Sequence, residues 1–153
     1  MTRAQKKPQR DSVGAWTKRC FFAGRAIMEA TLRPFDLGST QWYVLHQLAQ
    51  EGPTQQRDLV EMLQVERATM SGIVATLLRK GLVAQIPDRN DQRQKLLRLT
   101  AAGTKLWREL PDLTFIHKAA FGDIDEADIA VAVSVLQTAT QRLEDLLQKG
   151  EAA

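Results

Sequence analysis

The sequence predicts a mainly α-helical protein that carries one small β-hairpin. Three observations lead to this fold class. Over most of the 153 residues, apolar side chains recur at every third or fourth position, which is the spacing of one face of an α-helix. Glycine and proline interrupt this pattern at a few places and so divide it into separate helices. Only between residues 82 and 99 does the pattern change, to two short apolar runs around a polar tip, as in a hairpin.

Four helices are predicted in the N-terminal half, after a polar and basic arm at residues 1–10. They cover residues 12–32, 39–50, 55–63 and 67–80. Pro34 ends the first helix and Gly52-Pro53 ends the second, because proline cannot continue a helix. Only three residues, 64–66, separate the third helix from the fourth, and Gly81 is a candidate C-cap. A short helix, a tight turn and a second helix form the order of a helix-turn-helix.

The hairpin follows this pair directly. Its strands are predicted at residues 82–86 and 95–99, and the segment from Pro87 to Gln92 between them is dense in turn-forming residues. A helix-turn-helix followed by a hairpin is a winged helix-turn-helix, in which the hairpin is the wing.

Two more helices are predicted after the wing. Thr100 is a candidate N-cap for a helix over residues 101–121, with a kink at Pro111. Asp125 is the candidate cap of a last helix that ends near Lys149, whose apolar residues recur at nearly seven-residue steps.

Composition excludes several classes of protein. With 44% hydrophobic and 25% charged residues the chain is not disordered, and no apolar run reaches the roughly 18 residues of a membrane span. Because no apolar signal core is present and Cys20 is the single cysteine, we expect the protein to work in a reducing cytoplasm. No phosphate loop, nucleophile elbow or metal-ligand spacing is found, so we expect neither an enzyme nor a cofactor or metal.

Charge is distributed unevenly along the chain. The net charge is +3, but residues 1–25 sum to +6 and residues 54–100 to +3, whereas residues 101–153 sum to −4. A basic front and middle with an acidic tail favours one surface for polyanions and another that avoids them.

The predicted helix-turn-helix and wing carry residues suited to double-stranded DNA. The exposed side of the helix at 67–80 begins with small or hydrogen-bonding residues that let it enter the major groove: Arg67, Ala68, Thr69 and Ser71. The wing offers cations to the neighbouring minor groove: Arg89, Arg93 and Lys95. A winged-helix module that binds another protein, and not DNA, is the alternative.

Three motifs mark the segment from Trp42 to Gly103, and the first of them begins one residue earlier. They are Gln41-Trp42-Tyr43-Val44-Leu45, the run from Leu63-Gln64-Val65 through Thr69-Met70-Ser71 to Lys80-Gly81-Leu82-Val83, and Asp91-Gln92-Arg93 with Leu99-Thr100-Ala101-Ala102-Gly103. Together they make this segment resemble the MarR family of bacterial transcriptional regulators. The flanking helices agree with that family in order and rough length only.

The resemblance implies a homodimer that binds a pseudo-palindromic operator, and we expect this homodimer to act as a repressor. It also implies a bacterial cytoplasm, in association with the nucleoid. It implies one domain with three segments: an arm and dimerisation helix at 1–36, the winged helix-turn-helix at 37–100, and dimerisation helices at 101–153. Glu66 and Gly72 depart from the family's usual serine and arginine, which leaves the operator sequence open. We expect Asp91 to hold the wing through an ion pair.

The resemblance also implies a small aromatic carboxylate or phenol as effector, in a cleft between the dimer helices and the DNA-binding lobe. The candidate residues come from the first two helices: Trp16, Arg19, Cys20, Phe22, Trp42 and His46. The alternative is that the tryptophans lie in the core, while Arg19 and His46 lie at the surface. We expect Cys20 to be buried and inert, and a thiol that senses oxidation is the other interpretation.

Overall fold

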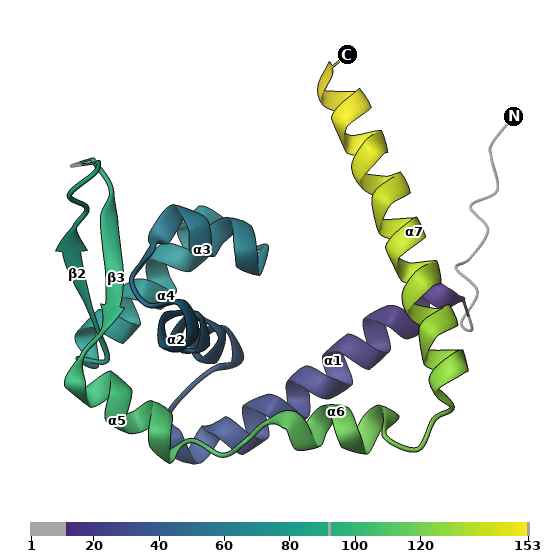
Figure 1. Ribbon diagram of the computed structural model, residues 1–153, viewed down its shortest axis with the longest axis horizontal. Coiled ribbons are helices and arrows are strands. Elements are labelled where there is room, and N and C mark those ends of the chain that lie inside the picture. Colours follow the sequence, from purple (N-terminus) through teal and green to yellow (C-terminus); the bar gives the residue numbers. More distant parts are fainter. Residues whose placement is uncertain (1–11, 92, 153) are drawn as a thin grey trace, which may run out of the picture. The chain divides into compact units, whose positions relative to one another are not determined.

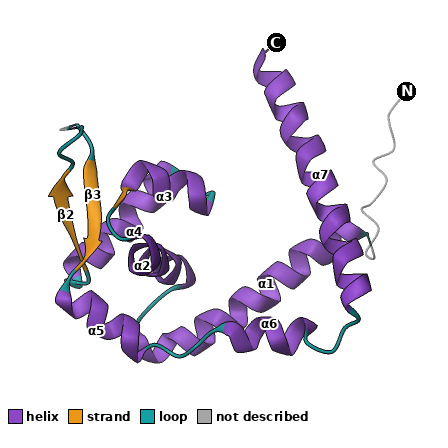
Figure 2. Ribbon diagram, viewed as in Figure 1, coloured by secondary structure: helices purple, strands orange, loops and turns teal. Residues whose placement is uncertain are grey.

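The computed structural model describes residues 12–91 and 93–152 and confirms a mainly helical fold with a small antiparallel sheet (Figures 1 and 2). The basic arm predicted at residues 1–10, and Gln92 of the wing, lie outside these ranges. The chain divides into two compact units, residues 1–112 and 113–153, and each is described by itself. The predicted division at residues 36 and 100 stays a prediction. No described helix is long and apolar enough to cross a membrane.

Helix α1 (Val13–Leu32) is the first element of the N-terminal unit. The Ser12 hydroxyl accepts a hydrogen bond from the backbone N–H of Ala15 at 3.1 Å and so caps the helix. Its buried residues, Met28 and Leu32, both belong to its last two turns. The chain then leaves the helix through the 3₁₀ turn η1 (Arg33–Phe35), as the proline at position 34 predicts.

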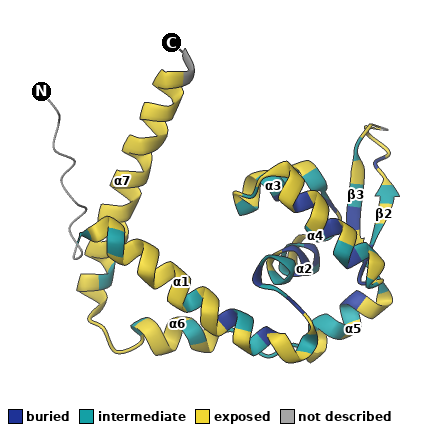
Figure 3. Cartoon of the chain, turned by 180° about the vertical axis from the view of Figure 1, so that it is seen from behind, coloured by how far each residue is buried: buried dark blue, intermediate teal, exposed yellow. Residues whose placement is uncertain are grey.

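Three helices build the core of this unit: α2 (Ser39–Glu51), α3 (Gln56–Leu63) and α4 (Arg67–Arg79). Each places its apolar stripe inward, and Figure 3 shows buried residues gathered on these helices and on the sheet. The largest fully buried side chains are Leu32, Val44, Leu45, Leu59, Met70, Leu77 and Leu97. The predicted boundaries of these helices agree with the structure to within one residue.

The sheet contains one strand more than the sequence predicts. Its strands are β1 (Thr54–Gln55), β2 (Val83–Pro87) and β3 (Lys95–Leu99), in the order β1-β3-β2, all antiparallel. The β2–β3 pair is the predicted wing, with β2 one residue later than expected. In the missed strand β1, Thr54 pairs with Leu97 and Gln55 with Leu96, which ties the segment after α2 to the wing.

The prediction of one kinked helix over 101–121 is wrong. Helix α5 (Ala101–Glu109) ends before Pro111, and a new helix, α6 (Thr114–Phe121), begins after it. The residue before proline avoids the helical region, and Leu110 has φ −67° and ψ 143°, which is extended backbone. The helix therefore breaks there.

The second unit consists of α6 and the 27-residue helix α7 (Glu126–Ala152). The Asp125 carboxylate accepts a hydrogen bond from the backbone N–H of Ala127 at 2.9 Å, as expected of a cap. All residues of α7 from 130 to 150 are exposed, including large apolar ones such as Leu143, 61% exposed, and Leu147, 67%.

Candidate nucleic-acid interface

Helix α4 is held by its apolar face and leaves the opposite face open. Met70, Val74 and Leu77 are buried, so they fix the rotation of the helix about its axis. The turn before it brings Gln64 to φ 53°, the left-handed region, and the N–H of Val65 bonds the carbonyl of Val60 at 3.3 Å. This tight turn sets α4 directly after α3.

The residues predicted for DNA contact lie on the open face of α4. Arg67, Ala68, Thr69 and Ser71 are all exposed, and Gly72 beside them has nothing within 4 Å of its missing Cβ. The amide Nε2 of Gln56 donates to the Ser71 hydroxyl at 3.3 Å and so links α3 to this face. The result is a shallow surface of small and hydrogen-bonding groups, with one guanidinium at its start. The N-cap, Glu66, makes no side-chain capping bond.

The three predicted wing cations, Arg89, Arg93 and Lys95, are exposed. Figure 1 shows the tip of the hairpin at the end of the wing away from α5. The tip is closed by backbone bonds, from the N–H of Asp88 to the carbonyl of Gln94 at 3.3 Å and from the N–H of Gln94 to the carbonyl of Asp91 at 3.0 Å.

Asp91 does not hold the wing through the predicted ion pair. Among the described residues it forms no ion pair, and its Oδ1 accepts a hydrogen bond from the backbone N–H of Arg93 at 3.1 Å. The carboxylate therefore stabilises the turn itself, because a side chain two residues before an N–H closes an Asx-type turn more readily than it reaches a distant cation.

The residue that anchors the wing is Asp88, which is not among the residues predicted from the sequence. Its Oδ2 accepts from Nε2 of Gln55 in β1 at 2.6 Å, and its Oδ1 accepts from the N–H of Asn90 at 2.9 Å. The bond from Asn90 and then that from Gln55 lower the pKa of Asp88. An aspartate two residues before Asn90 indicates the local turn, but no sequence signal indicates Gln55, which lies 33 residues away.

At its base the wing is joined tightly to α5. The Thr100 hydroxyl donates to the carbonyl of Gly81 at 2.6 Å and accepts from the N–H of Gly103 at 3.0 Å. The backbone N–H of Thr100 also bonds the carbonyl of Leu82 at 3.1 Å. Thr100 is therefore both the predicted N-cap of α5 and the link from α5 to the start of β2.

The predicted effector residues on α1 lie at the surface. Trp16 is 54% exposed, Phe22 is 50% exposed, and the Arg19 guanidinium lies 4.8 Å from the centroid of the Trp16 ring. Cys20 is exposed, so the expectation of a buried thiol is wrong for the chain as described. These residues lie in the first half of α1, and Trp16 precedes the first buried residue, Met28, by about 18 Å of helix.

The predicted effector residues on α2 form a separate cluster. The rings of Trp42 and His46 stack with centroids 5.0 Å apart and planes at 15°. Trp107 of α5 joins them, with its ring centroid 5.4 Å from Trp42 and 5.7 Å from His46. All three side chains are half-buried. Trp107 was not predicted as part of this cluster, because nothing in the sequence indicates that α5 packs beside α2.

Within the described ranges, no group of three or more histidine, cysteine, aspartate or glutamate side chains could hold a metal ion. The chemistry of this unit lies in its exposed cations, its small polar face on α4 and its aromatic cluster.

Comparison with known proteins gives consistent matches. The model of the MarR family matches residues 35–94. The transcriptional regulator FarR of Neisseria gonorrhoeae is 33% identical over 79 residues, which are 52% of this chain and 54% of FarR. The transcriptional repressor NicR of Pseudomonas putida is 31% identical over 96 residues, 63% of this chain and 61% of NicR. The chain thus spans between half and two thirds of these curated relatives.

A solved structure matches over nearly the whole chain. It is BpsR of Bordetella bronchiseptica, described as a protein whose DNA binding is regulated by 6-hydroxynicotinic acid. It is 26% identical, with a TM-score of 0.75, and the match covers 88% of this chain and 97% of BpsR.

Proposed function

The chain belongs to the MarR family of winged-helix proteins, and from this premise we propose that it is a transcriptional regulator that binds double-stranded DNA. The observation that carries the proposal is the pairing of two surfaces in one compact unit. The open face of α4 is small and polar, and the wing beside it carries three exposed cations.

We infer that α4 enters the major groove, which is about 12 Å wide and admits a helix. Arg67 is suited to a bidentate contact with guanine, and Thr69 and Ser71 to phosphates or base edges. Ala68 and Gly72 have little or no side chain, so at these positions the backbone of α4 can lie close to the DNA. On the wing, Arg93 with Arg89 and Lys95 is proposed to follow the backbone into the adjacent minor groove.

We further propose that the protein acts as a homodimer on a pseudo-palindromic operator. Large apolar side chains are exposed on α1 and on α7, for example Val13 at 64% and Leu146 at 62%. On each of these helices, the number of exposed large apolar side chains favours a contact with another protein surface. A two-fold dimer would place two copies of α4 about one turn of DNA apart.

The proposed mode of action is repression that a small aromatic acid relieves. NicR is named a repressor, and DNA binding by BpsR is regulated by an aromatic acid. An aromatic acid is suited to the two groups of residues proposed here for the effector: Trp16, Arg19 and Phe22 with Cys20 on α1, and Trp42 with His46 on α2. A ligand that binds the DNA-free arrangement more tightly than the DNA-bound one shifts the balance away from the operator.

The experiment is a DNA-binding titration of the purified protein on its own upstream DNA at two salt concentrations. For a DNA regulator, affinity falls steeply with salt because bound cations are released from phosphate. Arg93→Ala should weaken binding to most sequences and reduce the salt slope by about 1. Arg67→Ala should also change the sequence preference. Lys105→Ala on α5 removes one exposed charge outside both surfaces and serves as the control.

Three outcomes count against parts of the proposal. Unchanged affinity of Arg93→Ala would refute the role of the wing. Equal losses for Lys105→Ala and Arg93→Ala would indicate general charge and not a defined contact. Binding to a protein partner with no salt-sensitive DNA affinity would favour the protein-interaction alternative.

A further inference from the structure

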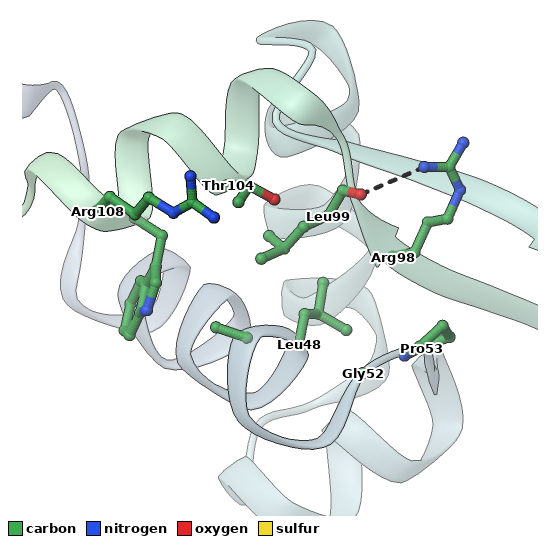
Figure 4. Close-up of a pocket in the computed structure, with 9 residues that line it drawn as sticks. Leu48, Gly52, Pro53, Arg98, Leu99, Thr104 and Arg108 are labelled. Carbon is green, nitrogen blue, oxygen red and sulfur yellow. Dashed lines mark hydrogen bonds between the residues drawn. The ribbon is translucent and has the colours of Figure 1, made fainter.

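The two ends of the wing are held in different ways. At the base, Leu99 of β3 and Leu48 of α2 line the same pocket, and α5 packs against both elements (Figure 4). Toward the tip, backbone pairing of β3 with β1 stops at Leu96, and β2 and β3 continue past this point as a pair. A ribbon of two strands alone is marginally stable in water. The position of the tip therefore depends on side-chain contacts that reach beyond β1.

The side chain of Gln55 makes such a contact. Gln55 ends β1 and is the N-cap residue of α3, but its amide makes no capping bond. Its Nε2 donates to Oδ2 of Asp88 at 2.6 Å, and its Oε1 accepts from Nη2 of Arg57 at 3.1 Å. A carboxylate only accepts and a guanidinium only donates, so the amide fits between them in one orientation. The amide thus joins a cation of α3 to an anion of the wing, and both hydrogen bonds are assisted by charge.

Asp88, the partner of Gln55, lies where the tip of the wing begins. It is buried, its Oδ1 accepts from the N–H of Asn90 at 2.9 Å, and its own N–H bonds the carbonyl of Gln94 at 3.3 Å. These bonds close the tip that carries Arg89 and Arg93. A displacement of Asp88 would therefore move both arginines.

The next residue, Gln56, contacts the other proposed DNA surface. Its Nε2 donates to the hydroxyl of Ser71 on α4 at 3.3 Å. Since Gln55 and Gln56 are adjacent, one short stretch of backbone is tied both to the wing tip and to the open face of α4. A protein that enters two grooves at once gains affinity when the spacing of the two parts is fixed before it binds.

We propose that Gln55 is a positioning residue for DNA binding. By holding Asp88, it keeps the wing tip at the distance from α4 at which Arg93 reaches the minor groove while α4 lies in the major groove. It acts through Asp88 and not by touching the DNA. Without this bond the tip samples more positions, and part of the binding free energy is spent on ordering it. This inference rests on the proposed DNA-binding function and deepens it.

The first test is a cycle of DNA-binding titrations. Gln55→Met keeps the length of the side chain but not its polar end, and it should weaken binding on the order of tenfold, close to the effect of Arg93→Ala. The double variant should bind about as weakly as either single variant, because an arginine on a loose tip contributes little. The control is Val44→Ala, which removes buried atoms of α2 and should lower stability in urea. In that background Arg93→Ala should keep its full effect.

A reversed pair tests the hydrogen bond itself. When Gln55→Glu and Asp88→Asn are combined, the amide at position 88 donates and the carboxylate at position 55 accepts, so the bond is restored with the net charge unchanged. Arg57 then faces a carboxylate, and position 88 still offers an oxygen to the N–H of Asn90. DNA binding should return to within about twofold of the parent. Gln55→Glu alone sets two carboxylates against each other and should bind worst.

The position of the tip can also be measured without DNA, as the distance between two spin labels in a Cys20→Ser background. Ala75→Cys on α4 and Asn90→Cys in the tip place the labels at exposed sites. The distance distribution should be narrow in the parent protein, broader with Gln55→Met, and narrow again with the reversed pair.

Three results would overturn the inference: an unchanged distance distribution in Gln55→Met, no recovery of DNA binding by the reversed pair, or a full effect of Arg93→Ala in the Gln55→Met background. If the parent protein binds DNA, each of these results leaves the proposed function standing. A parent protein that binds no DNA refutes the proposed function, and the role of Gln55 in DNA binding fails with it.

Discussion

Gly103, in the first turn of α5, occupies a position that admits no side chain. A Cβ built there lies 2.0 Å from the carbonyl oxygen of Leu82, whereas real Cβ atoms keep at least 3.0 Å from such neighbours. The obstructing atom belongs to the backbone, and it is already held by the N–H of Thr100 at 3.1 Å. A methyl group at Gly103 would therefore have to push α5 away from the start of β2.

The expected cost follows from two opposing effects. Forcing an extra carbon into a packed site costs about 3 kcal/mol, at the upper end of the usual range because backbone must move. Alanine in place of glycine inside a helix stabilises the folded protein by about 1 kcal/mol, because alanine has the higher helix propensity. We therefore expect Gly103→Ala to lower the free energy of unfolding by about 2 kcal/mol.

The assay is urea unfolding followed by circular dichroism. Gly72→Ala is the matched control, since Gly72 is also helical but has nothing within 4 Å of its missing Cβ. That variant should gain up to about 1 kcal/mol. If Gly103→Ala unfolds at the same urea concentration as the parent, or at a higher one, the reasoning about this contact is refuted.

Three further predictions concern the wing and α7. Thr100→Val removes the hydroxyl that joins Gly81 to Gly103 and should cost about 1 kcal/mol in urea unfolding; no loss would contradict its capping role. The pKa of Asp88 is lowered by folding, so its stabilising contribution is present above the ordinary aspartate value of 3.8 and is lost as pH falls through the lower folded value. In an acid titration followed by circular dichroism, Asp88→Asn should therefore lose less stability than the parent protein as pH falls. Identical profiles for the two proteins would exclude a contribution of the Asp88 carboxylate. Leu143→Glu should shift the protein to monomer in light scattering, whereas Thr138→Glu on another side of α7 should not; a dimeric Leu143→Glu would argue against α7 as the interface.

Features that depend on neighbours in sequence could be predicted. The ends of α2 and α4 follow from Gly52 and Gly81, which take φ 78° and 72°, values that few other residues adopt. The wing follows from two apolar runs around a turn, and Thr100 from its place before a helix. The open face of α4 follows from helical periodicity alone, since the side opposite Met70 and Val74 has to face outward.

Features that depend on distant partners could not be predicted. Strand β1 is two residues long, and only its pairing with β3 makes it a strand. Gln55 meets Asp88, and Trp107 meets Trp42, because separate elements pack side by side. Cys20 is the reverse case, because burial was predicted and the structure shows exposure. Helical periodicity places Cys20 on an apolar stripe of α1, but no described residue covers that stripe.

The long exposed helix α7 has a consequence for how the protein behaves as its amount changes. A solitary helix is marginally stable in water, and residues 130–150 of α7 are all exposed within one chain. Under the proposed dimerisation, burial of these side chains comes from a second copy, so stability follows mass action. The melting temperature should then rise with protein concentration, and dilution alone should lower the fraction of protein that is dimeric and fully folded. Cellular abundance would thereby set the fraction of fully folded protein, independently of any ligand.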